Sequence, residues 1–265
     1  MAKPPASEQI AVSKETGTSY VEFSTKTAAF WKSQLADGGI AWYKLAEEWY
    51  VDNCPSTVNG VLGGFAHLDP PDVKDSVRFY DKVRTLRDEA GCPLQTGHAL
   101  DGGAGIGRVT KHFLSNIFAQ VDLVEGNQRL LDAAPEFLAE KRAHLGELYC
   151  SSLQDFTPQA GRYDCIWVQW VIIYLTDEDL AKFLRRCSES LRPGGLIFIK
   201  ENVQFKTEKA DLLKDEDDSS VTRSNRLMRH IFEQAGLEII LEEEQTDFPA
   251  GMYPVMMYAL APPGK

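Results

Sequence analysis

The sequence predicts an α/β protein built on a doubly wound, mostly parallel sheet of seven strands, with a helical extension before it. Three observations lead to this prediction. Apolar runs of strand length recur along the chain, amphipathic segments of helix length separate most of them, and one strand-to-helix junction is rich in glycine. Such alternation is typical of a parallel sheet covered by helices on both faces. The length of 265 residues suits one large domain with an appendage.

Several segments have strand character: His98–Asp101, Gln120–Glu125, Leu148–Cys150, Tyr163–Gln169, Leu196–Glu201, Leu237–Glu242 and Val255–Leu260. Helices are expected between most of them. The clearest one begins at Thr176, where the letters T-D-E-D are similar to a capping box with Asp in the place of Glu. Too few residues separate Glu242 from Val255 for a helix, so we expect the last strand to insert antiparallel.

Aromatic residues at helical spacing predict two helices between Thr27 and Trp49, broken at Asp37-Gly38-Gly39. The preceding polar residues have no period and are expected to be flexible. We therefore divide the chain into a flexible N-terminus (1–25), a helical lid (26–66) and a main domain (67–265) that contains a polar insertion (203–222). The glycine-punctuated segment Val58–Phe65 is either a hinge or lid across a pocket or a simple turn.

The bulk composition narrows the classes of function. A net charge of −11 argues against binding of nucleic acid or an anionic membrane, and it fits either a basic partner or a soluble surface alone. The five cysteines are widely spaced without a C-x-x-C pair, which is typical of thiols in a reducing compartment. We expect no metal site. No apolar run approaches the roughly 20 residues of a membrane span, so we expect a protein of the cytoplasm, with the nucleus as a second compartment.

The most informative segment is A-L-D-G-G-A-G-I-G-R, residues 99–108. A dinucleotide-binding G-x-G-x-x-G fingerprint would need glycine at position 108, where Arg108 stands. The form G-x-G-x-G, with Asp101 just before it, suits an adenosine cofactor that has no pyrophosphate, and S-adenosylmethionine is the leading candidate. Glu125 ends the next strand, and an acid there can accept hydrogen bonds from both ribose hydroxyls.

Polar and aromatic side chains also follow the later strands. Gln169 and Trp170 stand at the carboxyl end of the fourth strand, where catalytic loops leave a parallel sheet. Trp170 is either core packing or an aromatic wall that attracts a methylated ammonium group. The acidic run Asp215–Asp218 lies in the insertion after the fifth strand. It is either a solvated loop or part of the pocket.

Taken in order, five motifs resemble those of the protein α-N-terminal methyltransferases: D-G-G-A-G-I-G-R-V-T-K, L-Q-D-F-T-P, W-V-Q-W-V-I, F-L-R-R-C-S-E-S-L-R-P-G-G and D-S-S-V-T-R. The resemblance covers about Trp49 to Leu260. It implies the Rossmann-like fold of class I methyltransferases, with S-adenosylmethionine as cofactor and S-adenosylhomocysteine as product. It also implies transfer of methyl groups to the free α-amine of protein tails that begin X-Pro-Lys or X-Pro-Arg after Met removal, by a monomeric enzyme.

The resemblance also implies site residues at matching positions. Cofactor contacts are expected at Gly103, Arg108, Glu125, Gly126, Asn127, Leu153, Gln154 and Gln169. Substrate contacts are expected at Trp49, Leu62, Trp170, Asn202, Asp215, Asp218, Ser220 and Tyr253. Catalytic roles are expected at Asp218, Tyr174 and Asn202. Trp170 would pack on the substrate's proline ring, and Asn202 would hold the first backbone carbonyl. Asp215 and Asp218 would receive the α-amine and the third residue, Lys or Arg.

The sequence departs from the family pattern at a few positions. Tyr174 stands where the family usually has His, and a phenol with a reference pKa of about 10 is a poor base at neutral pH. The base role is therefore expected to fall mainly on Asp218. Glu125 replaces the commoner Asp, and the spacing from Trp49 to Leu62 differs from that of the family.

Two other readings of the sequence remain. A small-molecule N-methyltransferase would share the glycine loop but has no reason to keep Asn202 together with the D-x-x-D-S-S sequence. A cofactor-binding interaction module without catalysis would be favoured by a site that lacked Asp218 or Asn202, and both are present.

Overall fold

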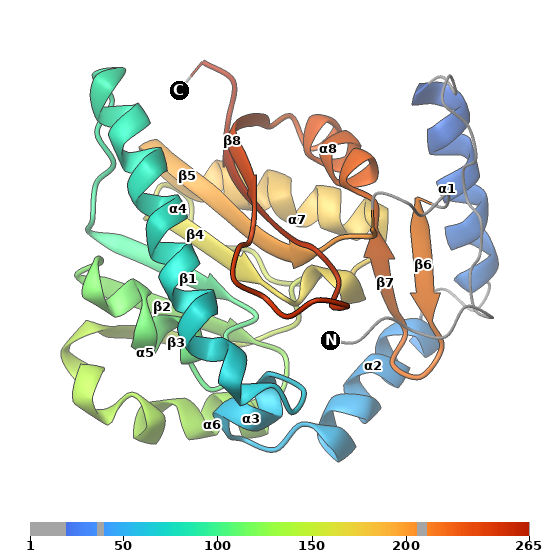
Figure 1. Ribbon diagram of the computed structural model, residues 1–265, viewed down its shortest axis with the longest axis horizontal. Helices are drawn as coiled ribbons and strands as arrows, with labels where there is room; N and C mark the ends of the chain where they lie inside the picture. The colour runs from blue at the N-terminus through green and yellow to red at the C-terminus, as the bar shows by residue number, and fades with distance from the viewer. Residues whose placement is uncertain (1–19, 36–39, 206–210, 265) are drawn as a thin grey trace.

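A seven-stranded sheet forms the centre of the computed structural model, which describes residues 20–35, 40–205 and 211–264 (Figure 1). In the order in which they lie side by side, its strands are β3 (Leu145–Cys150), β2 (Gln120–Glu125), β1 (His98–Gly102), β4 (Tyr163–Gln169), β5 (Leu191–Asn202), β9 (Val255–Ala261) and β8 (Glu238–Glu244). Neighbours from β3 to β5 pair in parallel, whereas β9 is antiparallel to both β5 and β8. The predicted α/β sheet is confirmed, including its antiparallel last strand.

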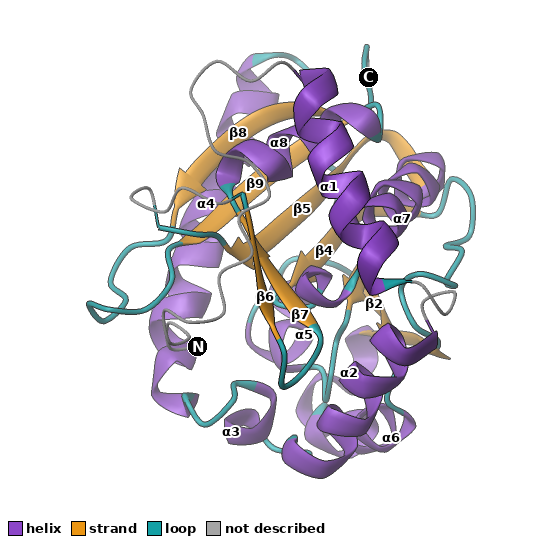
Figure 2. Ribbon diagram, turned by 90° about the vertical axis from the view of Figure 1, so that its right-hand side faces the viewer, coloured by secondary structure: helices purple, strands orange, loops and turns teal. Residues whose placement is uncertain are grey.

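Helices cover both faces of this sheet (Figures 1 and 2). They are α4 (Asp69–Glu89), α5 (Arg108–His112) and α6 (Gln128–Phe137) on one face, and α7 (Asp177–Ser190) and α8 (Asn225–Gln234) on the other. Successive side chains of β4 show why both faces of the sheet have to be covered. Cys165 and Trp167 belong to the core cluster beneath α4, whereas Ile166 and Val168 belong to the cluster beneath α7. A strand buried on both faces in this way is typical of a parallel sheet.

The segments before the sheet are α1 (Tyr20–Gln34), α2 (Ile40–Asn53) and α3 (Val58–Val61). The two helices predicted between Thr27 and Trp49 are confirmed, and α1 starts earlier than expected, at Tyr20. Residues 1–19 and the break at Asp37-Gly38-Gly39 lie outside the described residues. The segment Val58–Phe65 forms α3 and then a turn in which Gly63 and Gly64 take positive φ angles.

A separate two-stranded hairpin follows β5. Its strands are β6 (Leu212–Asp215) and β7 (Ser220–Arg223), and they pair antiparallel. With the turn between them they make up most of the described part of the insertion predicted over 203–222, and residues 206–210 lie outside the described residues. The turn between the two strands carries the acidic run. In the parts of the chain that the structure covers, no helix is long and apolar enough to cross a membrane.

The predicted helix start at Thr176 is confirmed, with one difference in its hydrogen bonds. The Thr176 hydroxyl accepts from the Asp179 amide at 3.1 Å, but the Thr176 amide donates to the Tyr43 hydroxyl, and not to Asp179. Tyr43 in turn donates to the Asp179 carboxylate at 2.5 Å. A residue of α2 therefore completes the reciprocal bond that an Asp is too short to make.

We expect Thr176→Ala to lower the free energy of unfolding by about 1 kcal/mol, because the Asp179 amide loses its partner at the start of α7. Chemical denaturation monitored by circular dichroism measures this. Thr85→Ala is the matched control, since its hydroxyl donates only to the Asp81 carbonyl within α4 and caps no helix. Equal losses in the two variants would contradict the capping role.

Candidate active site

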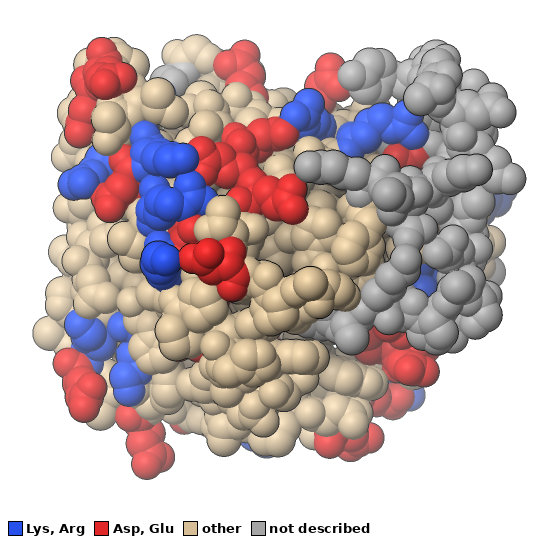
Figure 3. All heavy atoms as spheres, in the orientation of Figure 1, with Lys and Arg blue, Asp and Glu red and all other residues tan. Residues whose placement is uncertain are grey.

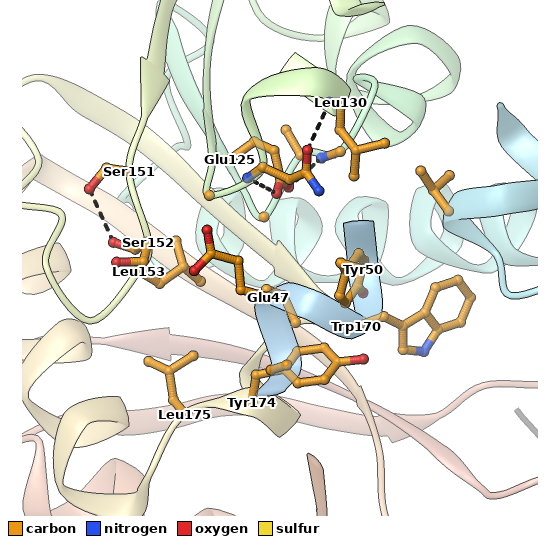
Figure 4. Close-up of a pocket in the computed structure, with 18 of the residues that line it drawn as sticks. Glu47, Tyr50, Glu125, Leu130, Ser151, Ser152, Leu153, Trp170, Tyr174 and Leu175 are labelled. Atoms are coloured by element: carbon orange, nitrogen blue, oxygen red, sulfur yellow. Dashed lines mark hydrogen bonds between the residues drawn. The ribbon is translucent and has the colours of Figure 1, made fainter. Parts of the chain in front are cut away.

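A cavity of about 560 Å³ lies at the carboxyl ends of β1, β2 and β4 (Figure 4). We call it the large cavity. Ligands of open α/β sheets bind at this edge, and the volume is that of a small-molecule site. The residues for which the sequence predicts cofactor contacts all line it: Gly103, Arg108, Glu125, Gly126, Asn127, Leu153, Gln154 and Gln169. The structure therefore brings together a set that is spread along the sequence from Gly103 to Gln169.

The glycine loop lines the large cavity with Gly103, Ala104 and Gly105. Gly103 has a φ of +73°, and a Cβ at this position would lie only 2.7 Å from the side chain of Val171. The site therefore requires glycine both for backbone conformation and for space. Asp101, just before the loop, accepts hydrogen bonds from the amide and the hydroxyl of Thr110. Burial raises the pKa of Asp101 to about 6. These bonds fix the loop to α5.

Glu125 is placed to bind two adjacent hydroxyl groups. Its two carboxylate oxygens accept from the amides of Gly105 at 2.9 Å and Asn127 at 2.8 Å, and burial raises its pKa. Each oxygen has a second lone pair, so the carboxylate can accept from a ligand without releasing the loop. The Asn127 side chain caps α6 through its oxygen, while its buried Nδ2 has no hydrogen-bond partner within the described structure. A donor left in this way fits an adenosine ligand in the cavity.

Arg108 is held by two carboxylates in front of the large cavity. Its Nη1 donates to Asp69 at 2.7 Å and to Asp72 at 2.8 Å. Gln169 also donates to Asp72, and the Lys200 ammonium lies 2.5 Å from the same carboxylate. Although burial alone would raise the pKa of Asp72, Lys200 and Arg108 lower it. Asp72 of α4 thus fixes two of the cavity-lining side chains.

A second, narrow cavity adjoins the first. It is lined by Tyr50, Val61, Leu62, Phe65, Leu68, Trp170, Asn202, Phe248, Met252, Tyr253 and Val255. Tyr50, Val61 and Trp170 line both cavities and form the junction between them. Most of the lining is apolar, and Asn202 supplies an amide. Four expected substrate residues are therefore placed here: Leu62, Trp170, Asn202 and Tyr253.

Trp49 is one of the expected substrate residues that line neither cavity. It is half-buried and packs edge-on against Tyr50, with ring centroids 5.6 Å apart. Successive residues of a helix point about 100° apart, so only one of this pair can face the junction. The structure gives that place to Tyr50, which the sequence analysis did not single out.

The acidic hairpin meets the large cavity at Tyr174. The Tyr174 hydroxyl donates to Asp218 at 3.2 Å, and the other Asp218 oxygen accepts from the Ser220 amide. Burial raises the pKa of Asp218, and the charge of Asp215 raises it further. Burial also raises the pKa of Tyr174 well above its usual value, so the phenol is neutral and acts as a donor. Asp215, Asp218 and Ser220 are all carried by the hairpin, outside the lining of the two cavities.

Positive φ angles at non-glycine residues occur in three segments near the candidate site. Within the described residues, Trp170, Ser219 and Asp247 are the non-glycine positions with positive φ, at 53°, 53° and 61°. Trp170 lines both cavities, Ser219 follows Asp218, and Asp247 precedes the cavity residue Phe248. Such conformations cost about 1–3 kcal/mol each and persist where the surroundings enforce them, often at functional sites.

Glu201 is a second residue that the sequence analysis missed. It is fully buried and accepts hydrogen bonds from the amides of Ile172 and Asn202, at 3.1 and 2.9 Å. Burial raises its pKa to about 7. The signal was a charged residue at the end of the apolar run Leu196–Ile199 of a central strand, where a carboxylate is costly unless it has partners. It joins the Tyr174 loop to the end of β5.

This fold and this large cavity define a class I S-adenosylmethionine-dependent methyltransferase. The structure superposes on an S-adenosylmethionine-dependent methyltransferase of Leishmania major with a TM-score of 0.77 and 36% identity, over 88% of this chain and 90% of that chain. The family model described as AdoMet-dependent proline di-methyltransferase matches residues 39–261, and the chain belongs to this family.

Relatives of known activity are similar over nearly their whole length. The N-terminal Xaa-Pro-Lys N-methyltransferase 1 of Homo sapiens is 43% identical over 230 residues, which cover 86% of this chain and 99% of that protein. The protein of the same name from Danio rerio is 42% identical over 226 residues, covering 85% and 98%.

Proposed function

We propose that the protein transfers methyl groups from S-adenosylmethionine to the free α-amine of proteins that begin X-Pro-Lys or X-Pro-Arg after Met removal. The observation that carries this proposal is the arrangement of the two cavities and the hairpin. The narrow, mostly apolar cavity, which holds the Asn202 side chain, joins the large cavity at Trp170. Half-buried Asp218 is hydrogen-bonded to Tyr174, which lines the large cavity. The names of the relatives support the same substrate.

Each feature of the proposed substrate has a matching group. The apolar side chains of Leu62 and Trp170 suit a proline ring, which has no amide hydrogen to satisfy, and the narrow cavity of about 30 Å³ has to widen to admit it. Asn202 can donate to a backbone carbonyl in the same cavity. The carboxylates of Asp215 and Asp218 suit two cations, the α-ammonium group and the side chain of the third residue. The net charge of −11 favours the approach of a basic tail, and Figure 3 shows acidic side chains at several places on one face of the molecule.

Bound in the large cavity, S-adenosylmethionine supplies an electrophilic methyl group, and the chain has to present a neutral amine to it. An α-amine has a reference pKa of about 7.7–8.0, against about 10.4 for Lys, so part of it is neutral at physiological pH. Asp218, whose pKa burial raises, takes the remaining proton. Tyr174 stays protonated and orients Asp218 by its hydrogen bond. The larger part of the acceleration comes from aligning amine and methyl.

We also propose a monomer that works in the cytoplasm and the nucleus. All five cysteines are free thiols, which fits a reducing compartment. Sedimentation of the purified protein tests the oligomeric state, and fractionation of the cells of origin tests the compartments.

The experiment that tests the activity is incubation with S-adenosylmethionine and a peptide that begins Ser-Pro-Lys, followed by mass spectrometry. We expect the mass to rise in steps of one methyl group. The same peptide with an acetylated N-terminus should gain none, because its nitrogen has no basic lone pair. A peptide beginning Ser-Ala-Lys should react at least about tenfold more slowly, since it leaves the apolar cavity unfilled. Cofactor binding without transfer to any peptide would instead favour a small-molecule acceptor.

A further inference from the structure

Trp42 of α2 joins three parts of the molecule at the proposed transfer site. Its buried indole Nε1 donates to the backbone carbonyl of Tyr174 at 2.8 Å. The Lys214 ammonium of the hairpin lies 5.8 Å from the centre of its ring, and the edge of Trp31 from α1 packs against it with centroids 5.0 Å apart. One side chain thus touches the Tyr174 loop, the acidic hairpin and the first helix.

The helix α1 precedes the residues that the family model matches, which begin at 39. It is nevertheless packed into the protein, because Phe30 and Trp31 are both only 6% exposed. The two rings meet edge-on at 4.9 Å, and both belong to the core cluster that also contains Trp42 and the buried face of α7. Figure 2 shows α1 on the same side of the sheet as α7. The buried aromatic side of α1 is therefore directed at Trp42.

The backbone of the loop between β4 and α7 is hydrogen-bonded to the hairpin, to β5 and to α2. Arg223 of the hairpin donates to the Ile172 carbonyl at 2.9 Å, and Glu201 accepts from the Ile172 amide. Arg223 also donates to the Leu175 carbonyl. From α2, Trp42 donates to the Tyr174 carbonyl and Tyr43 accepts from the Thr176 amide. These contacts hold the backbone at Tyr174 and on both sides of it in the sequence, and Tyr174 is the residue that donates to Asp218.

We propose that Trp42 and Trp31 are positioning residues for Tyr174. Trp42 holds the Tyr174 backbone through its hydrogen bond, and Trp31 of α1 holds Trp42 by packing against it. The Tyr174 hydroxyl is 3.2 Å from Asp218, longer than most O–H···O hydrogen bonds. A displacement of the Tyr174 backbone away from the hairpin therefore weakens this bond further. The expected effect of Trp42 and Trp31 on the rate of methyl transfer rests on the proposed function. Their effect on the position of the Tyr174 backbone does not.

Two variants and a control test the proposal. Trp42→Phe keeps an aromatic ring but removes the indole N–H, and Trp31→Leu removes the ring that packs against Trp42. Tyr258→Phe is the matched control, because it also removes one hydrogen bond from a buried aromatic side chain, here to Asn225 between β9 and α8. Amide hydrogen exchange over residues 171–176, measured by mass spectrometry, reports how firmly the backbone of the loop is held, and it needs no substrate.

We expect exchange over 171–176 to be about tenfold faster in Trp42→Phe, since the tethering bond is lost, and faster also in Trp31→Leu, with Tyr258→Phe unchanged. With the Ser-Pro-Lys peptide, kcat should fall by about tenfold in Trp42→Phe, while the dissociation constant for S-adenosylhomocysteine stays within about twofold. In the background of Tyr174→Phe, the further loss caused by Trp42→Phe should nearly vanish, because both substitutions then act on the same hydrogen bond.

Unchanged exchange over 171–176 in Trp42→Phe would overturn the proposal, whether or not the wild type methylates the peptide. Unchanged exchange in Trp31→Leu alone would overturn the role of α1. Losses of kcat that add fully in the double variant would show that Trp42 acts on general stability and not through Tyr174. A wild type that does not methylate the peptide would contradict the proposed function. The exchange rates would then still show whether Trp42 and Trp31 hold the loop in place.

Discussion

The Asp218→Asn variant is expected to lose kcat by about 100- to 1,000-fold while it binds the cofactor as tightly as the wild type. Asn keeps the shape of the side chain and can still meet the Tyr174 hydroxyl, but it cannot accept a proton from the amine. Asp218 does not line the large cavity, so cofactor affinity should be unaffected. Single-turnover methylation of the Ser-Pro-Lys peptide and titration with S-adenosylhomocysteine measure the two quantities.

The exposed neighbour provides the control for charge. Asp217→Asn removes the same formal charge from the same turn, but Asp217 points to solvent and its amide only donates back to Asp215. We expect this variant to change KM for the basic peptide by less than about threefold and to leave kcat unchanged. Full methylation by Asp218→Asn at neutral pH would rule out Asp218 as the proton acceptor.

The pH profile should separate the two titrating groups. Burial raises the pKa of Asp218, so on the acid side the carboxyl is protonated and can no longer take a proton from the amine. Activity therefore falls as the pH drops through that raised pKa. On the alkaline side the α-amine itself becomes neutral, with a reference pKa of about 8, and kcat/KM should level off. In Asp218→Asn the acid limb should follow the amine alone.

The sheet was predictable because its signals are local. The runs of β2 and β4 were predicted with their observed bounds, since each is an apolar run that ends at a polar residue, Glu125 and Gln169. The start of β5 was less predictable. The strand begins at Leu191 and not at Leu196, because Leu191 pairs with Tyr163 across a register shift that a sequence with Pro193 and two glycines does not suggest.

The site was predictable where it follows strand ends and less so where it depends on tertiary contacts. The glycine loop and Glu125 belong to continuous motifs, and the structure places them around one cavity. Tyr50 and Asp72 gave no such signal. Whether Trp49 or Tyr50 faces the junction depends on the rotation of α2, and Asp72 in D-P-P-D reads as an ordinary first turn of a helix. Its partners Arg108 and Lys200 are distant in sequence, so its role appears only when the chain is folded.

Glu125→Ala is expected to raise the dissociation constant for S-adenosylmethionine by about 100-fold. A hydrogen bond to a charged group contributes about 1.5–3 kcal/mol, and two such bonds to the ribose hydroxyls are lost, which more than suffices for a factor of 100. The carboxylate also holds the Gly105 and Asn127 amides, so the loop loses two bonds of its own. Isothermal titration calorimetry measures the affinity, and circular dichroism checks the fold.

Three comparisons distinguish a cofactor contact from a general effect on the fold. Glu136→Ala removes an exposed acid from α6, outside the lining of the large cavity, and should leave the affinity unchanged. Glu125→Asp keeps both acceptor oxygens on a shorter stem and should weaken binding by less than about tenfold. Because burial raises the pKa of Glu125, wild-type affinity should decline as the pH drops through that raised pKa, whereas Glu125→Ala should show no such decline. Tight binding by Glu125→Ala would place the ribose elsewhere in the cavity, and the large cavity would then hold the cofactor through its glycine loop alone.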